Sequence, residues 1–142
     1  MEMIITATVL LILASAVVPM AKNGIKRQKE LELRRDLREM RYAIDAYKQA
    51  VEQQKVKAPP IENAGYPESL DILVEGVPAM GKTAKVRFLR RIPVDPFTGQ
   101  QEWGFRSVTD DADSTSWGGS SVFDVYSLSR GTGFNGIPYK KW

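Results

Sequence analysis

Residues 3–21, with the sequence MIITATVLLILASAVVPMA, decide the fold of this 142-residue chain because no charged side chain interrupts them. As an α-helix rising about 1.5 Å per residue, this stretch would be roughly 28 Å long, close to the ~30 Å hydrocarbon core of a bilayer. A cleavable signal peptide would begin with basic residues and have a shorter apolar core. The chain instead begins Met1-Glu2. The sequence therefore predicts a retained membrane-spanning helix over residues 1–21.

Two residues of this segment are unusual for a membrane helix. Pro19 has no backbone N–H and its ring clashes with the carbonyl of Ser15, which predicts a kink or local unwinding. The alternative is a routine proline that neighbouring helices accommodate. Glu2 has two interpretations. As an acid in the first turn it interacts favourably with the helix dipole. If its carboxylate is instead drawn into apolar surroundings, this placement costs about 2.5–3.5 kcal/mol and requires a cationic partner.

Beyond the apolar segment, residues 22–58 have the pattern of an amphipathic helix. Apolar residues recur at intervals of four and three and form one seam: Leu33, Leu37, Met40, Ile44, Tyr47 and Val51. On the charged faces we expect ion pairs four residues apart: Glu30–Arg34, Arg35–Glu39 and Arg41–Asp45. The helix should end before Pro59-Pro60. The seam could form a coiled-coil dimer or pack on the protein's own sheet, and its short length favours packing.

Residues 59–142 predict a small α+β globular head. A short helix or turn is expected at residues 66–74, and strands are expected at residues 101–108 and 122–128. The polar loop of residues 109–121 would join these strands as an antiparallel pair. So small a sheet needs a partner for its apolar face, and the seam can supply one. The predicted fold class is α+β, with a long N-terminal helix packed on a small antiparallel sheet.

Composition removes several classes of function. The chain has no Cys and no His, which excludes disulfides, thiolate metal sites and catalysis by an imidazole base. Its formal net charge is only +3, and residues 22–41 contain four acidic residues beside eight basic ones: Lys22, Lys26, Arg27, Lys29, Arg34, Arg35, Arg38 and Arg41. A solvated helix face is the favoured interpretation of these charges, against contact with lipid headgroups or DNA. We expect a protein that is not an enzyme and has no nucleic-acid partner.

Residues 76–83, GVPAMGKT, match the phosphate-binding loop pattern G-x-x-x-x-G-K-[ST]. A working site of this kind lies between a strand of a parallel sheet and a long helix. Pro93 and Pro96 interrupt the segment that would have to form that helix. An exposed loop containing glycine is therefore favoured over a membrane-anchored nucleotide-binding protein.

Asp110, Asp111 and Asp113 form a cluster of carboxylates in the long polar loop. Calcium prefers six to eight oxygen ligands, so these residues are candidate calcium ligands. Their order does not match an EF-hand loop, and acidic loops are usually just solvated. We expect no other cofactor.

The chain resembles the type IV pilin-like proteins, in particular the major, G-type pseudopilins of type II secretion. Mature chains of that family open with an apolar helix that has a glutamate near its start and a proline seventeen residues later, as Glu2 and Pro19 are placed here. Further similar motifs are Tyr66-Pro67, Trp103-Gly104 and the segment FDVYS at residues 123–127. The most specific motif is the block IPVDPFTG at residues 92–99, which contains Pro93, Asp95, Pro96 and Gly99.

The resemblance implies a structural subunit that polymerises with its own kind into a helical filament serving type II secretion. The alternative is another pilus-like filament for adhesion, motility or DNA uptake. Glu2 would pair with the terminal amine of a neighbouring subunit, and the helix around Pro19 would loosen during assembly. Expected partners are the inner membrane before assembly, the secretion or pilus assembly machinery, and the prepilin peptidase that acts on the precursor.

The resemblance also bears on membrane topology. Lys22, Lys26, Arg27 and Lys29 follow the apolar segment, and the positive-inside rule alone would place that side in the cytoplasm. Family precursors carry a short basic leader on the cytoplasmic side, which the peptidase removes. The implied topology is a single inner-membrane span with the head outside the cytoplasm, and later a periplasmic or extracellular filament.

Two features depart from the family pattern. Members usually have more residues before the glutamate, so this chain either lacks a few native residues or has an unusual mature start. G-type pseudopilins often bind calcium in their C-terminal loop, but the corresponding stretch here, residues 129–135, contains no acidic residue.

Overall fold

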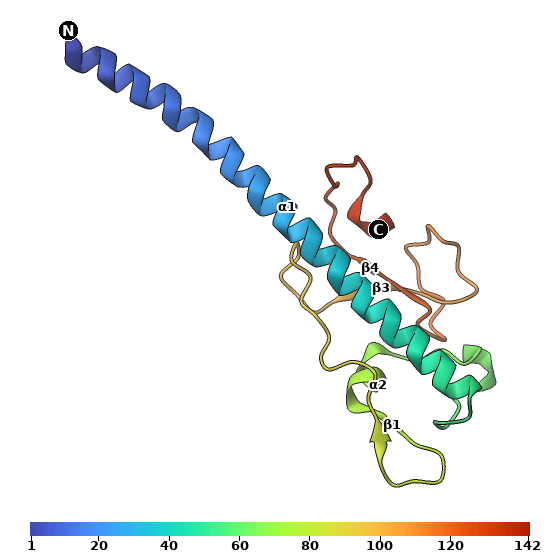
Figure 1. Cartoon of the computed structure of the whole chain (residues 1–142). Helices are drawn as coiled ribbons and strands as arrows, with labels where there is room; N and C mark the ends of the chain where they lie inside the picture. Colours follow the sequence, from blue (N-terminus) through green and yellow to red (C-terminus); the bar gives the residue numbers. More distant parts are fainter.

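A computed structural model describes all 142 residues and shows one long helix with a small head beside its second half (Figure 1). The long helix, α1, spans Glu2–Glu52. The head contains two short 3-10 helices, one short α-helix and four short strands. In chain order these are η1 (Ile61–Asn63), α2 (Leu70–Glu75), β1 (Val77–Pro78), β2 (Lys85–Val86), β3 (Trp103–Arg106), β4 (Asp124–Ser127) and η2 (Tyr139–Lys141).

The helix α1 is continuous over 51 residues and passes through Pro19 without interruption. Figure 1 shows a gentle bend along the helix instead of a sharp kink, so the local unwinding expected at Pro19 is absent from this isolated subunit. A proline removes one hydrogen bond of the ladder, and the turns on either side retain theirs. The helix ends where Gln54 adopts a left-handed conformation, with φ of 54°, before the Pro59-Pro60 pair.

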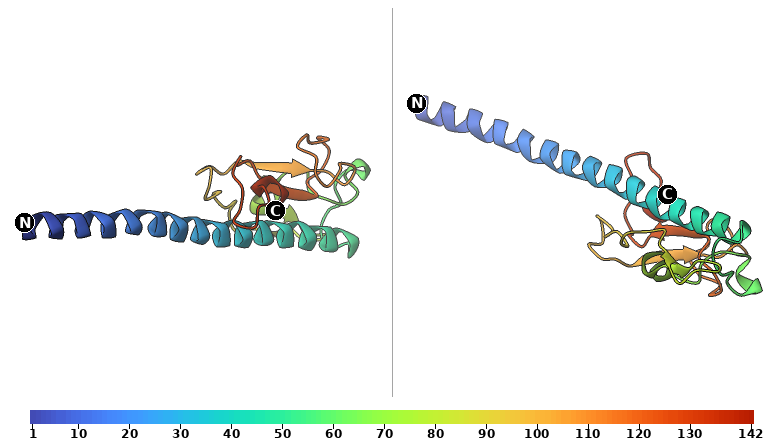
Figure 2. Two further views of the ribbon diagram at one scale, coloured as in Figure 1. Left: turned by 90° about the horizontal axis from the view of Figure 1, so that it is seen from above. Right: turned by 60° about the horizontal axis from the view of Figure 1, so that its bottom comes forward.

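The second half of α1 packs its apolar seam on the head, as Figure 2 shows from two sides. Leu33, Met40 and Ile44 are completely buried, Leu37 and Tyr47 nearly so, and Val51 is half-buried. The residues of the head that complete this core come from α2, from β3 and β4, from the loops that precede these strands, and from η2. They include Leu73, Leu89, Trp103, Val122, Val125 and Tyr139. The predicted α+β arrangement, with the helix packed on the protein's own sheet, is confirmed.

The head has two separate two-stranded antiparallel sheets. Strands β3 and β4 pair Trp103 with Ser127 and Arg106 with Asp124, and they lie within the two segments that the sequence predicts as strands. Gly104 lies directly under the ring of Tyr126, where a Cβ atom would come within 2.2 Å of the ring carbons. A residue without a side chain is therefore required there.

The second sheet, β1 with β2, was not predicted, and it accounts for the phosphate-loop pattern at residues 76–83. Gly76 ends α2 with φ of 89°, Val77 and Pro78 form β1, and the remaining residues turn back toward β2. Lys82 and Thr83 are exposed and no helix follows them. Residues 79–84 therefore form the exposed glycine-containing loop that the sequence favoured, without the helix start on which a phosphate cradle depends.

Candidate assembly surface

The first half of α1 projects from the head and is exposed along its whole length (Figure 1). An 18-residue window of this helix has a mean hydropathy of 2.4, and none of that window is buried. Large apolar side chains such as Ile4 and Leu11 are 72% and 71% exposed. Water disfavours apolar surface by about 25 cal/mol per Å², so a continuous apolar surface of this size needs a cover of lipid or protein. The helix is long and apolar enough to cross a membrane.

Glu2 and Pro19 both lie on this exposed segment, and the structure does not bring them together. Glu2 is in the first turn of α1 and forms no ion pair within the chain. Pro19 lies near the other end of the apolar segment, roughly 25 Å further along the helix axis. The carboxylate of Glu2 is thus free to meet a group from outside the subunit.

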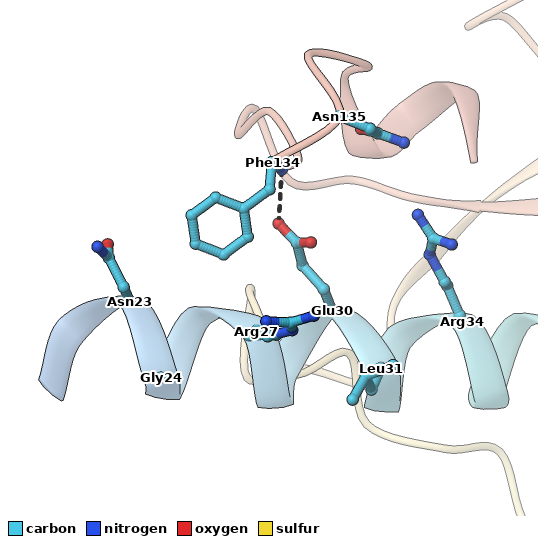
Figure 3. A pocket seen from close by; sticks show the side chains of 8 residues that line it. All are labelled: Asn23, Gly24, Arg27, Glu30, Leu31, Arg34, Phe134 and Asn135. Carbon is cyan, nitrogen blue, oxygen red and sulfur yellow. Dashed lines mark hydrogen bonds between the residues drawn. The ribbon is translucent and has the colours of Figure 1, made fainter. Parts of the chain in front are cut away.

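The junction between the exposed and the packed half of α1 is tied to the C-terminal loop (Figure 3). The buried carboxylate of Glu30 accepts hydrogen bonds from the backbone N–H of Phe134, at 3.0 Å, and from the hydroxyl of Tyr139, at 2.9 Å. Lys26 donates to the carbonyl oxygen of Thr132 at 2.8 Å. The predicted Glu30–Arg34 pair does not form, because Arg34 stacks on the ring of Trp142 instead, 4.3 Å from its centroid.

The contact between Glu30 and Tyr139 predicts a loss of stability in alkali. Burial and the neighbouring Glu30 carboxylate raise the pKa of Tyr139 to about 12, from 10.0. A raised pKa means that the folded state holds the phenolic proton more tightly, so its stabilising contribution is complete below pH 10 and is lost as the pH rises toward 12. The stability advantage of the natural chain over Tyr139→Phe should therefore shrink by about 2–3 kcal/mol across this range.

The measurement is urea unfolding of both chains at several pH values, with phenolate absorbance as a direct titration of the tyrosines. The four other tyrosines remain in Tyr139→Phe and serve as its internal control. A difference in stability that stays constant between pH 10 and pH 12 would contradict the assignment.

A second set of long-range contacts joins the middle of α1 to β3, β4 and the C-terminus. Asp124 binds Arg41 through Oδ1 at 2.6 Å, and its Oδ2 accepts from Arg106 at 3.2 Å and from Arg41 at 3.4 Å. Arg41 also donates to the carbonyl oxygens of Val125 and Trp142. The predicted Arg41–Asp45 pair is therefore wrong, since the guanidinium turns toward the head.

The third predicted pair, Arg35–Glu39, is also absent. Arg35 binds Asp36 at 3.1 Å and lies 3.8 Å from Glu32. Asp36 is buried, and its desolvation raises the pKa of its carboxyl above 3.8, although Arg35 opposes this shift. At neutral pH the ionised carboxylate of Asp36 thus lies in surroundings that favour its neutral form, which lowers the stability of the folded state.

Substitution of Asp36 by asparagine is consequently expected to leave the free energy of unfolding at pH 7 unchanged or to raise it by up to about 1 kcal/mol. The advantage should shrink as the pH falls through the raised pKa and vanish below about pH 3, where the aspartate is neutral in both states. Urea unfolding at pH 7 and at about pH 3 measures it. A loss of 2 kcal/mol or more, of the order expected when a needed charged hydrogen bond is removed, would contradict this expectation.

The block of residues 92–99 forms a loop that a buried carboxylate closes. Asp95 is fully buried; it accepts hydrogen bonds from the backbone of Phe97 and from the hydroxyl of Ser127 on β4. Pro93 accepts a hydrogen bond from the indole of Trp103 on β3, at 3.0 Å. Pro96 is half-buried, and Gly99 provides the turn with φ of 72°. These contacts fix the loop to the β3–β4 sheet.

The aspartates of the long polar loop do not converge. Asp110 accepts hydrogen bonds from the backbone N–H groups of Ser107 and Gly118, which lowers the pKa of its carboxyl and closes the loop on itself. Asp113 pairs with Lys141, and Asp111 is exposed. No group of three or more acidic side chains is placed to hold a metal ion, so the predicted calcium cluster does not form.

No protein-family model, curated protein or solved structure matches this chain.

Proposed function

We propose that this protein is a structural subunit that polymerises through the first half of α1 into a helical, pilus-like filament serving type II secretion. The observation that carries the proposal is the division of one continuous helix. The apolar face of its second half is buried against the head, whereas the apolar surface of its first half is not covered by any part of the subunit. A bilayer would cover that surface before assembly, and the same segment of neighbouring subunits would cover it in the filament.

Glu2 is proposed to direct the packing of subunits. A carboxylate among apolar helices costs about 2.5–3.5 kcal/mol unless a cation neutralises it. The terminal amine of a neighbouring subunit is such a cation, and its ion pair with Glu2 would set one subunit at a defined height against the next. This role comes from the resemblance to G-type pseudopilins and is supported by the lack of any partner for Glu2 within the chain.

The resemblance also supplies the proposed location, with α1 in the inner membrane and the head outside the cytoplasm until the subunit enters a filament. The lack of Cys and His fits a structural role and not a hydrolytic one.

Deletion of the gene tests whether the filament serves secretion. The proposal predicts loss of protein export that the natural gene restores and a gene for Glu2→Leu does not, while twitching motility and DNA uptake stay normal. Normal export together with lost twitching or transformation would contradict the secretion role and favour another pilus-like filament.

A further inference from the structure

The first observation concerns the charge that follows the apolar segment. Lys22, Lys26, Arg27 and Lys29 come directly after residue 21, and no acidic residue lies among them. Along the helix axis the last three lie about 7–12 Å beyond that residue. Headgroup layers are about 5–8 Å thick on each side of the hydrocarbon core. Because side chains on a helix lean toward its N-terminus, these long basic side chains reach back to the depth of the lipid phosphates.

The second observation is that the head reaches the same level. Two of its loops contact α1 between residues 26 and 30: Lys26 binds Thr132 and stacks on Phe134, and Lys29 lies 6.0 Å from the ring of Phe97. In Figure 3 the ring of Phe134 points along α1 toward its N-terminal end. Phe134 is 54% exposed, and Val94 on the other loop is 47% exposed. Exposed apolar side chains beside basic residues are typical of surfaces that insert at the boundary between headgroups and acyl chains.

The third observation is that these charges have no acidic partner within the chain. Lys22, Arg27 and Lys29 form no ion pair, although other basic residues of α1 such as Arg41 and Lys48 do. The nearest acid along α1, Glu30, is buried, and its carboxylate is occupied by hydrogen bonds from Phe134 and Tyr139.

We infer that, in the membrane-anchored subunit, this edge of the head docks on the bilayer surface and binds the headgroups of anionic phospholipids. The edge consists of Lys22, Lys26, Arg27, Lys29, Val94 and Phe134, and the inference rests on the proposed membrane anchoring of α1. Docking holds the head at a fixed height above the bilayer until the subunit leaves the membrane. A membrane is favoured over a second copy of the chain because the charges lie within headgroup reach of the apolar segment, where lipid is always present.

Fluorescence quenching in vesicles tests the docking. The chain has no cysteine, so Asn135→Cys gives a unique fluorophore site beside Phe134, and Met80→Cys gives a matched exposed site on the hairpin at the far end of the head (Figure 1). The full chain is reconstituted in phosphatidylcholine vesicles, with and without a third of phosphatidylglycerol, and a quencher is attached to the headgroups. The charge variant is Lys22→Gln/Arg27→Gln/Lys29→Gln, and its charge-matched control is Lys55→Gln/Lys57→Gln/Lys82→Gln.

We expect strong quenching at position 135 and little at position 80. Quenching at position 135 should rise with phosphatidylglycerol and fall with added salt. The ratio of docked to undocked heads should fall about fivefold for each basic residue removed in the charge variant, and the control variant should behave as the natural chain.

Three results would overturn the inference. Equal quenching at both positions would show that the head does not bind the headgroups through this edge. Quenching at position 135 that is the same with and without phosphatidylglycerol, and in the charge variant, would show the same. Quenching that rises with the ratio of protein to lipid would identify a second copy of the chain as the occupant. Flotation of the vesicles separates these outcomes from failure of the anchor, because a chain that does not float with lipid contradicts the membrane anchoring itself.

Discussion

Substitution of Asp124 by alanine is expected to lower the free energy of unfolding of the head by about 2–4 kcal/mol. The Asp124 side chain is 24% exposed and holds two guanidinium groups, of which Arg106 is only 5% exposed. Removal of the carboxylate would leave the buried charge of Arg106 uncompensated, and such charges are costly in the protein interior. Arg106 keeps its hydrogen bonds to the carbonyls of Ser114 and Lys140, which limits the loss.

The measurement is urea unfolding of the full chain in a mild detergent, followed by tryptophan fluorescence. Asp113→Ala is the matched control, because Asp113 also pairs with a basic residue but is 71% exposed. Its substitution should cost no more than about 0.5 kcal/mol. Equal losses in the two variants would contradict the structural role given to Asp124.

Substitution of Leu37 by alanine is the second large effect, with an expected loss of about 2–5 kcal/mol. Leu37 is 2% exposed at the centre of the seam between α1 and the head, where truncation leaves a cavity among well-packed neighbours. In the variant the head should detach from α1 more readily, while the exposed half of the helix keeps its structure.

Leu31→Ala is the matched control for Leu37→Ala, since the same residue type on the same helix is 64% exposed. Its expected effect is within about 0.5 kcal/mol. The same unfolding measurement serves both variants. A large loss in Leu31→Ala, or a negligible one in Leu37→Ala, would contradict the assignment of the buried face.

Hydrophobic patterning accounts for the parts of the structure that could be predicted. The length of the uninterrupted apolar segment and the helical period of the seam from Leu33 to Val51 both predict the long helix. The strands β3 and β4 lie within two short runs of strand-favouring residues that the long polar loop separates. Hydrophobic patterning also predicted that the small sheet packs on the seam, because the seam was the one apolar helix face available to cover it.

The polar contacts could not be predicted in the same way. All three expected ion pairs joined residues four apart on α1, each worth only about 0.2–0.5 kcal/mol. In the folded chain Glu30 and Arg41 instead form hydrogen bonds with residues between 124 and 142, and these hydrogen bonds are partly or fully buried. A local pattern contains no information on such distant neighbours, so the pairs that are formed became visible only with the fold.

Loop carboxylates show the same limit. Asp95, Asp110 and Asp113 are all acids beside turn residues, yet one is buried, one closes its own loop and one forms an exposed pair. The sequence Asp95-Pro96 followed by Thr98-Gly99 was a usable signal for the first, because such a residue caps turn N–H groups. Nothing comparable marked the difference between Asp110 and Asp113.

Electron microscopy of sheared cell-surface material tests the central claim, that the exposed half of α1 drives assembly. Cells would produce the natural chain, Glu2→Leu, or the control Glu39→Gln, which changes an exposed acid on the packed half of the same helix. We predict filaments containing the natural chain and the control, and none from Glu2→Leu, with all three proteins present in the membrane in equal amounts. Monomers alone from every strain, or filaments unaffected by Glu2→Leu, would contradict it.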